Sequence, residues 1–588
     1  MYKRLLLKDS LFEMALLAVL VGIIAGLGAV VFRAMIGFFH NIAFLGKLSF
    51  FYNANEHTPS SPWGAAIILV PVVGSIFVSF LIQKFAPEAK GHGVPEIVDS
   101  IYYNRGIIRP VVAVVKSLAS ALTISTGGSV GREGPIAQIG ASFGSTLGQI
   151  IRMPDWQRIT LVGAGAGAGI AATFNTPIGG LLFAIELIIP EISARSLIPV
   201  ALATGTATSI GRIFFGDTPS FNIPALTLPT VHALQAGVFI TYAFLGLMLG
   251  MAALLFILAI YGMEDLFEKM PGNYYTRHMF GMLMIGLMMY LFMSWFGHYY
   301  IQGVGYSTVQ DILMKNLTVP SLLLLLFGAK LLATSITLGS GGSGGIFSPS
   351  LFLGATLAGG YGLLLNHAYP TLQLDIVGMA VVGMAGFVGA ATGAVMTAIV
   401  MIFEMTRDYN IIIPLMITVS IAYGIRRLLF DDSIYSLKLT RRGHTIPQSM
   451  QTYWSVSQTA GSVVSRPIAQ AANDEELLEV ASRVARTPHI LLTEDGIVKG
   501  VLSAEQIRKA RRSNMKLTDL AGSPYIVVAA GTSLLDVFTM MRNKDAEVAI
   551  ITQDGELENV EDVMGILSLA EVARATNLPP HISQSNPS

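Results

Sequence analysis

Cysteine is absent from this chain of 588 residues, and charged residues are scarce. Without cysteine there is no disulfide, thiolate metal ligand or cysteine nucleophile, and the redox compartment cannot be inferred. Only 13% of the residues are charged, where a soluble protein usually has about a quarter. Lysine plus arginine balance aspartate plus glutamate at 37 each, so electrostatics do not favour nucleic-acid binding. These shortages argue against an ordinary soluble protein and for a membrane protein.

The few charges are unevenly distributed. Residues 441–588 carry 31 charged residues, about 21% of that stretch, which is normal for a soluble domain. Residues 1–440 carry 43, about 10%. We therefore predict a membrane domain followed by a soluble one. The predicted boundaries are 1–440 for the membrane domain, 441–455 for a linker, 456–580 for the soluble domain and 581–588 for a tail.

Long apolar runs support the membrane assignment. A spanning helix needs about 20 apolar residues, and the clear runs are 14–38, 64–83, 233–263, 279–297, 374–403 and 410–425. Shorter runs, broken by glycine and proline, cover 135–150, 177–190 and 347–366. Half-length helices at membrane depth are tolerated where they line a protein-buried or wet cavity, and transporters use them to point helix ends at ions. Alternatively, some of these short runs are tilted or re-entrant segments with a purely structural role.

Basic residues predict the orientation in the membrane. Lys3, Arg4 and Lys8 precede the first apolar run, and Lys438 and Arg441 lie just before the soluble domain. Since positive loops favour the cytoplasmic side, we expect both termini there. The sequence thus predicts an integral multi-pass protein of a plasma membrane or bacterial inner membrane.

The membrane part contains an internal duplication. Residues 116–141 align with 330–355 at a shift of 214, with 11 identical pairs among 26 positions. A second match, at shift 218, overlays the stretch ending at Glu186 on the one ending at Glu404. Lysine, threonine and proline match as well as glycine and alanine, so low complexity does not explain the alignment. The two predicted copies cover about 60–210 and 232–428.

Each copy carries a Gly-rich turn before an apolar stretch with proline near its start, over 127–135 and 341–349. Glycine allows close approach of the backbone, and proline suits the first turn of a helix. The free N–H groups of such a helix end attract anions without a full cation, and binding that is weak enough for release suits conduction. A single turn of this kind would be read as a helix cap or packing turn, but its repetition favours a site.

Two nucleotide motifs are excluded. No Gly-Lys-Ser/Thr follows either turn, so neither is a P-loop. The run Gly163–Gly169 imitates a dinucleotide fingerprint, but no strand precedes it, and small-residue helix packing explains it better.

Four separated motifs resemble those of the CLC family of chloride channels and chloride/proton exchangers. The resemblance covers about residues 10–440. The motifs are Gly91-His-Gly-Val-Pro95, Gly131-Arg-Glu-Gly-Pro135, Gly345-Ile-Phe-Ser-Pro349 and the region around Tyr435. The residues expected to support these motifs are Gly91, Gly93, Pro95, Gly131, Arg132, Gly134, Pro135, Gly345, Pro349 and Lys116. The resemblance implies an all-helical fold of two inverted repeats with broken helices, assembled as a homodimer with one pore per subunit.

The resemblance also implies an anion site. Backbone N–H groups of Ile346 and Phe347 and the hydroxyl of Tyr435 would replace the hydration shell of chloride. Without the resemblance, Tyr435 would be read as an interfacial tyrosine. Glu133 resembles the family's gating glutamate: its carboxylate would compete with the anion, and protonation would displace it. An ionisable group at membrane depth is usually functional, although a first-turn acid also stabilises a helix.

Nearby cations have two interpretations. Arg132 and Lys116 raise the local potential for anions, or Lys116 packs and snorkels.

Two departures from the family pattern bear on mechanism. His92 stands where the family usually has a serine that helps to hold the anion, and a neutral imidazole still donates one N–H. A charged imidazole would bind an anion more tightly and add pH sensitivity; the alternative is a bystander at the cytoplasmic mouth. Leu187 stands where many exchangers have an inner proton-transfer glutamate. Since leucine carries no proton, it favours uncoupled conduction, although some exchangers also lack this acid.

The soluble region resembles a tandem CBS pair. Residues 485–507 and 544–572 each read as helix, apolar strand, Asp-Gly turn, apolar strand and helix. CBS pairs often bind adenine nucleotides through Ser/Thr and an Asp three positions on. The matching residues here are Ser503, Gln506, Ser568 and Glu571. Because neither acidic position is Asp, a purely structural dimerising domain is favoured over nucleotide binding.

The sequence therefore predicts chloride conduction by a CLC channel gated by Glu133. The expected partners are chloride or another small anion, the lipid bilayer and a second copy of the chain, with proton coupling left open. No catalytic constellation, metal site or required cofactor is expected. The alternatives are a chloride/proton antiporter, a cation-coupled organic-solute carrier and a nucleotide sensor anchored in the membrane. Fluoride export is less favoured, because Pro135 and Tyr435 follow the chloride pattern.

Overall fold

The chain divides into two units, Met1–Ile446 and Pro447–Ser588, which are described separately. The computed structural model describes residues 11–189, 193–217, 221, 223–224, 236–444, 459–464, 469–472, 475, 480, 489–503, 506–507, 510, 517 and 522–575. The predicted tail 581–588 and most of the predicted linker lie outside the described residues.

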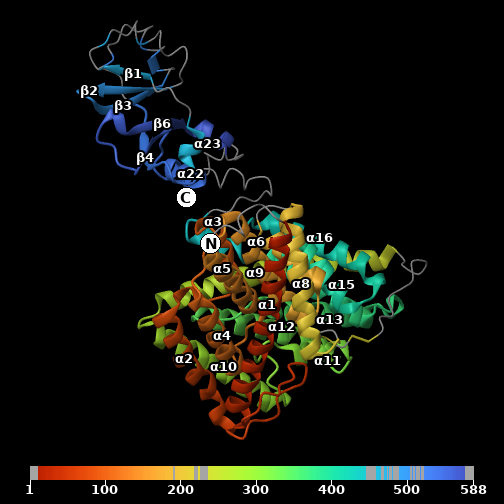
Figure 1. The fold of residues 1–588 in the computed structure, drawn as a ribbon. Helices are drawn as coiled ribbons and strands as arrows, with labels where there is room; N and C mark the ends of the chain where they lie inside the picture. The colour runs from red at the N-terminus through yellow and green to blue at the C-terminus, as the bar shows by residue number, and fades with distance from the viewer. Residues whose placement is uncertain are drawn as a thin grey trace. The chain divides into compact units, whose positions relative to one another are not determined.

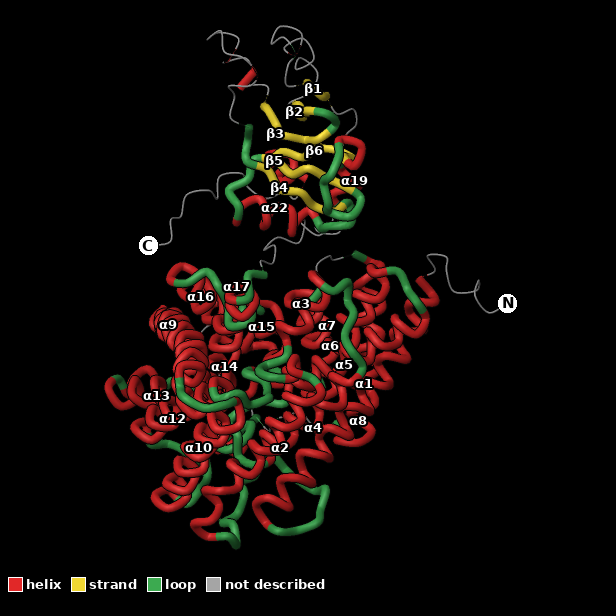
Figure 2. The backbone as a smooth tube through the Cα atoms, turned by 90° about the vertical axis from the view of Figure 1, so that its left-hand side faces the viewer, coloured by secondary structure: helices red, strands yellow, loops and turns green. Residues whose placement is uncertain are grey.

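The first unit is helical throughout its described part (Figures 1 and 2). Its α-helices are α1 (Leu11–His40), α2 (Val70–Phe85), α3 (Val94–Tyr103), α4 (Val111–Ser125), α5 (Glu133–Ile151), α6 (Asp155–Phe174), α7 (Pro177–Leu187), α8 (Ala194–Phe215), α9 (Ala236–Lys269), α10 (Tyr274–Phe296), α11 (Tyr306–Leu313), α12 (Pro320–Gly339), α13 (Phe347–Ala368), α14 (Ile376–Thr392), α15 (Val395–Thr406), α16 (Ile412–Leu429) and α17 (Ser436–Arg441). A π-helical turn, Asn41–Leu45, extends α1, and a 3₁₀ segment, Gly64–Leu69, precedes α2.

Eight of the described helices are long and apolar enough to cross a membrane, and others are shorter, such as α4, α7, α14 and α15. Two predictions of helix length were wrong. The run 374–403 is not one helix, because Gly393 adopts φ +83° and ends α14 before α15 begins. The run 347–366 is not a short broken segment. It forms the 22-residue α13, whose proline lies in the first turn, where no N–H is required.

Small residues let the helices of this unit pack closely. A Cβ on Gly165 would lie 2.1 Å from the carbonyl oxygen of Gly140, so α6 and α5 meet backbone to backbone. Gly144 faces Leu161 in the same way, and Gly354 on α13 faces Gly383 on α14. The run Gly163–Gly169 therefore serves helix packing, as expected of small residues in membrane helices.

The two copies cap each other's helices. The Glu404 carboxylate accepts hydrogen bonds from the N–H groups of Ile178 and Gly179 at the start of α7. The Glu186 carboxylate accepts from Met396 and Thr397 at the start of α15. Each acid thus satisfies donors that a helix N-terminus leaves free, and the exchange is reciprocal across the duplication.

The second unit is a small α/β region (Figures 1 and 2). Strands β1 (Ala469–Ala472), β2 (His489–Glu494) and β3 (Ile497–Ser503) form one sheet, and β4 (Tyr525–Ala529), β5 (Val548–Thr552) and β6 (Val563–Ser568) form another. In both sheets the first pair is parallel and the second antiparallel. The described helices include α19 (Ala460–Val463), α22 (Leu534–Asn543) and α23 (Leu569–Ala575).

The two halves of this unit differ at their turns. Asp495 and Gly496, both at positive φ, close β2 and β3 as a tight hairpin. Asp554-Gly555 lies instead at the start of a longer connection that contains the 3₁₀ turn Val560–Asp562. The Asp-Gly turn predicted for the second half is therefore only part of its β5–β6 connection.

Candidate functional site

The two Gly-rich turns meet in the core of the membrane unit. Gly131 and Gly345 each donate a backbone N–H to the other's carbonyl oxygen, at 2.6 Å in both directions. The pairing is antiparallel. The starts of α5 and α13 are thereby brought together, although 214 residues separate the equivalent positions.

The third motif joins this pair through its backbone. The Gly91 N–H donates to the Gly342 carbonyl at 3.1 Å, and the Gly344 N–H donates to the Gly91 carbonyl at 3.2 Å. Gly134 must be glycine, because a Cβ there would lie 2.1 Å from the carbonyl oxygen of His92. The motif glycines therefore allow three turns to share one small volume.

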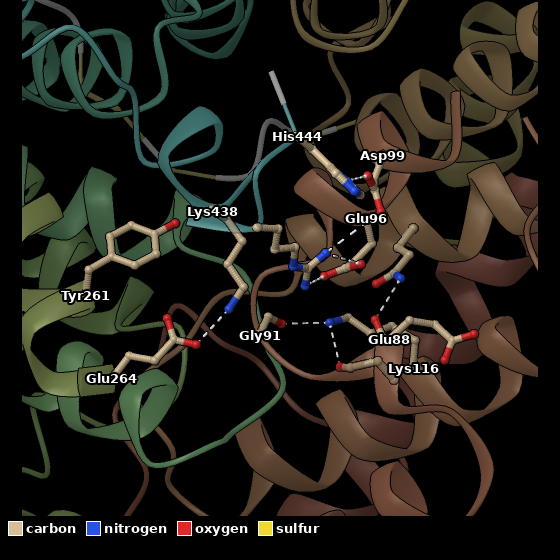
Figure 3. Close-up of polar contacts among 12 residues, drawn as sticks. Glu88, Gly91, Glu96, Asp99, Lys116, Tyr261, Glu264, Lys438 and His444 are labelled. Atoms are coloured by element: carbon tan, nitrogen blue, oxygen red, sulfur yellow. Dashed lines mark hydrogen bonds and ion pairs between the residues drawn. The ribbon is translucent and has the colours of Figure 1, made fainter. Parts of the chain in front are cut away.

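Two buried lysines anchor loops beside the site. Lys116 on α4 donates to the carbonyls of Ala89 at 3.0 Å and Gly91 at 2.7 Å. Its equivalent Lys330 on α12 donates to Ile301 at 2.9 Å and Gly303 at 2.8 Å. Figure 3 shows Lys116 pointing at Gly91. A packing and anchoring role for Lys116 explains these contacts.

Glu133, the acid of the motif, is deeply buried, with 1% of its surface exposed. Its Oε1 accepts hydrogen bonds from the hydroxyls of Tyr306 and Ser348. Its Oε2 lies 3.3 Å from the backbone nitrogen of Ser348, in the first turn of α13. The carboxylate thus lies at the N-terminal end of a helix in the other copy, where a bound anion would be stabilised.

Ile346 and Phe347 occupy the start of that same helix. Ile346 is the residue before α13, Phe347 is its first residue, and both are buried. Groups at this position have no acceptor within the helix. The ring of Phe347 packs 5.5 Å from that of Phe174 at the end of α6. The structure therefore places the predicted anion donors and Glu133 at one helix end.

Tyr435 and His92 lie close together. Their ring centroids are 6.1 Å apart, and both residues are buried. Tyr435 precedes α17 and lies within electrostatic reach of Glu133. The Nδ1 atom of His92 is buried without a hydrogen-bond partner in the described part of the chain. A buried polar atom without a partner is uncommon and suits a group that faces a ligand.

The remaining motif residues begin helices, form turns or place a positive charge near Glu133. Pro95, Pro135 and Pro349 each lie in the first turn of a helix, where proline is tolerated. Gly93 adopts φ +90° just before α3. The Arg132 Nε lies 4.0 Å from Glu133 Oε1 and is itself buried without a hydrogen-bond partner among the described residues.

Ion pairs tie α17 and the residues after it to neighbouring helices. Lys438 contacts Glu264 on α9 at 2.8 Å, and His444 contacts Asp99 on α3 at 2.5 Å (Figure 3). Arg442 donates two hydrogen bonds to Glu96 on α3, which raise the pKa of Arg442. Since α17 directly follows Tyr435 and α3 follows His92, these pairs fix the spacing of the two rings.

The proposed nucleotide residues are engaged in helix caps. The Ser503 N–H donates to Gln506 Oε1 at 2.8 Å, and the Gln506 N–H donates to Ser503 Oγ at 3.3 Å. Ser568 and Glu571 exchange the same pair of bonds, and the Ser568 hydroxyl adds a third. This is the reciprocal pattern of a capping box, which agrees with the structural interpretation of these residues. No metal-binding group of three or more candidate side chains occurs among the described residues.

Sequence reasoning missed Tyr306 and the hydroxyl of Ser348. Ser348 could have been noticed, because it lies between Phe347 and Pro349 inside a motif. Tyr306 follows a Gly303-Val-Gly305 turn and begins the eight-residue α11, outside every motif. Only the fold brings it to Glu133.

Comparisons with known proteins agree with this arrangement. A family model described as "Voltage gated chloride channel" matches residues 74–427. The H(+)/Cl(-) exchange transporter ClcA of Cronobacter sakazakii is 32% identical over 445 residues, which are 75% of this chain and 92% of that protein. ClcA of Klebsiella pneumoniae is 31% identical over 444 residues, 75% of this chain and 91% of that protein.

Solved structures share the fold. A slow cyanobacterial Cl⁻/H⁺ antiporter matches with a TM-score of 0.63 and 23% identity, over 73% of this chain and 97% of that one. A eukaryotic CLC transporter matches with a TM-score of 0.62 and 19% identity, over 95% of this chain and 98% of that one. The second match includes most of the C-terminal unit. Because the family match spans more than half of the chain and a relative is 32% identical, this protein belongs to the CLC family of anion transporters, is an integral multi-pass membrane protein and is not an enzyme.

Proposed function

We propose that this protein exchanges chloride for protons across the membrane. The observation that carries the proposal is the buried Glu133 carboxylate at the start of α13, where a halide would also be bound. The relatives that are about a third identical over three quarters of the chain are named H(+)/Cl(-) exchange transporters. Their names favour exchange over the uncoupled conduction predicted from Leu187.

The geometry suggests how one residue links the two ions. Ionised Glu133 occupies the donors of α13 and competes with chloride for the positive helix end. A proton neutralises the carboxylate and removes this advantage, so the anion replaces it. Chloride would then rest on the N–H groups of Ile346 and Phe347, with Tyr435 and His92 on the other side. The roles of these residues are part of the proposal.

A channel is the second candidate, and Leu187 favours it. Leu187 ends α7 and has no group that carries a proton. An exchanger with leucine here needs another inner proton route. The cavity beside α3 is lined by Glu88, Glu96, Asp99 and Gln138 together with Arg105 and Arg109, and it is a place to search for one.

Reconstitution in liposomes separates the two candidates. An outward chloride gradient is imposed at equal pH, and both chloride and proton movement are followed. The membrane potential is clamped at zero with valinomycin and equal K⁺ on both sides. An exchanger then moves protons into the liposomes and builds up a pH gradient. Chloride flux without proton movement would make the protein a channel, and transport of neither ion would contradict both candidates.

The resemblance supports further assignments of the same protein. We propose a homodimer of inverted-repeat subunits with both termini in the cytoplasm, and a tandem CBS pair in the C-terminal unit. The equal strand order of the two small sheets supports the tandem pair. We propose that this unit has a structural role and does not bind adenine nucleotide, since Ser503, Gln506, Ser568 and Glu571 cap helices. Equilibrium dialysis of the detergent-solubilised protein with labelled ATP tests this, and saturable binding would contradict it.

A further inference from the structure

Two hydroxyl groups from the second copy surround the Glu133 carboxylate. Tyr306 is the first residue of α11, and its Oη donates to Glu133 Oε1. The Ser348 Oγ lies 2.5 Å from the same Oε1 and 2.9 Å from the Tyr306 Oη. All three side chains are buried. The carboxylate therefore lies in a closed cluster of three oxygen-bearing groups.

The number of protons in this cluster depends on the charge of Glu133. Each hydroxyl has one proton to donate. With Glu133 ionised, both hydroxyls donate to Oε1 and no proton remains for the 2.9 Å contact between them. With Glu133 protonated, an acceptor becomes a donor and the pattern must rearrange. Hydrogen bonds to a charged acceptor are about twice as strong as neutral ones, so the cluster favours the ionised carboxylate in its present place.

Tyr306 is held rigidly enough to position its partner. Its ring packs edge to face against Phe221 at 4.8 Å, and the Arg132 guanidinium lies over the ring at 5.2 Å. The loop that leads into it is anchored by Lys330 through the carbonyls of Ile301 and Gly303. Locked side chains of this kind preorganise a functional group.

We propose that Tyr306 and Ser348 are positioning residues that hold ionised Glu133 in the anion pathway and set the pH at which it leaves. The proposal rests on the proposed function, in which Glu133 is the gate. Besides Tyr306, the charged or titratable groups near the carboxylate are Arg132 at the start of its own helix and Tyr435 before α17. From α13 the neighbour is the uncharged Ser348.

The test is the pH dependence of chloride flux in liposomes for Tyr306→Phe, Ser348→Ala and the double variant. Removing a donor to the carboxylate makes protonation easier, so the pH of half-maximal flux should move upward by about one unit for each hydroxyl. Ser350→Ala is the matched control, because Ser350 is buried on the same helix and donates to the Ile346 carbonyl instead. Its profile should equal that of the wild type.

Combination with Glu133→Gln separates positioning from a structural effect. In the Gln background neither hydroxyl substitution should change the pH profile. Suppose that Glu133→Gln alone abolishes the pH dependence. The proposal is then overturned if the Tyr306→Phe/Ser348→Ala double variant has the same pH of half-maximal flux as the wild type. If Glu133→Gln keeps the wild-type dependence, Glu133 is not the gate and both proposals fall. Should Tyr306→Phe not fold, the shift measured for Ser348→Ala alone decides.

Discussion

The two Gly-rich turns share one backbone arrangement and differ in the groups they present. At the shift of 214, Gly131 matches Gly345, and each bonds the other. Three positions that follow have diverged: Arg132 matches Ile346, Glu133 matches Phe347, and Gly134 matches Ser348. The first turn therefore contributes a charged acid and the second contributes N–H groups and a hydroxyl. The two turns therefore keep one backbone arrangement, and their side chains differ at these three positions.

The largest expected effect comes from adding a Cβ at Gly134, where the second turn carries the side chain of Ser348. Gly134→Ala should abolish chloride flux, because the new Cβ would lie 2.1 Å from the His92 carbonyl oxygen. Such overpacking costs about 1–3 kcal/mol or more. The measurements are flux in liposomes and thermal stability in detergent. Gly205→Ala, where nothing lies within 4 Å of the new Cβ, is the control and should be neutral.

Neutralising the acid makes the first turn resemble the second. Glu133→Gln should abolish proton coupling while retaining chloride flux, because the amide carries no titrating proton. Wild-type flux should rise as pH falls, since protonation removes the competing charge, whereas the variant should be flat. Paired recordings with chloride and pH electrodes check this. A slope equal to that of the wild type would remove Glu133 from the mechanism.

Substitution of Lys116 and of its equivalent Lys330 tests whether the two copies still depend on their lysines in the same way. Lys330→Met removes the lysine donor from the carbonyls of Ile301 and Gly303, which should cost about 1–3 kcal/mol of stability. Lys116→Met should cost less, because the Ala89 carbonyl keeps the Ser343 hydroxyl and the Gly91 carbonyl keeps the Gly344 N–H. Both should lower Tm, Lys330→Met by the larger amount. Lys116→Met should also weaken chloride binding, because Gly91 borders His92, and Lys330→Met should alter the pH profile through Tyr306. Isothermal titration with chloride and flux against pH distinguish them; identical changes would contradict this division.

The smallest effect is expected at His92, in the third turn. His92→Ser places a hydroxyl there and should change the chloride/nitrate selectivity by a few fold, because the imidazole has a buried Nδ1 without a partner among the described residues and lies 6.1 Å from the Tyr435 ring. Reversal potentials in mixed-anion bilayers measure this. Tyr103→Phe at the C-terminal end of α3 is a control that should keep the wild-type ratio. An unchanged ratio for His92→Ser would make this residue a bystander.

Local patterns predicted much of the fold. Apolar runs indicated the spanning helices, and the duplication was visible because the lysine, proline and glycine positions are fixed by backbone contacts. The break at Gly393 was missed, since a helix end within a continuous apolar run depends on one φ angle rather than on hydropathy. Pro349 was correctly predicted in the first turn of a helix, but the run 347–366 was also taken as short and broken, although it forms the 22-residue α13.

The site was only partly predictable. Glu133, Ile346, Phe347 and the motif glycines lie in contiguous segments, so sequence alone could group them by motif. Tyr306 could not be grouped, because its contact with Glu133 spans 173 residues and depends on the loop held by Lys330. The sequence likewise did not reveal that Glu186 and Glu404 cap helices reciprocally. Each acid caps a helix of the other copy, far away along the chain.

That exchange of caps has a consequence for biogenesis. The N-terminus of α7 is satisfied by Glu404, whose backbone partner Ile178 lies 226 residues earlier. At synthesis rates of about 5–20 residues per second, the first half waits roughly ten to fifty seconds for its cap. During that interval the free N–H groups of α7 must be solvated or held by the insertion machinery. A nascent chain arrested before Glu404 should therefore remain sensitive to proteases, and the two halves should become resistant together.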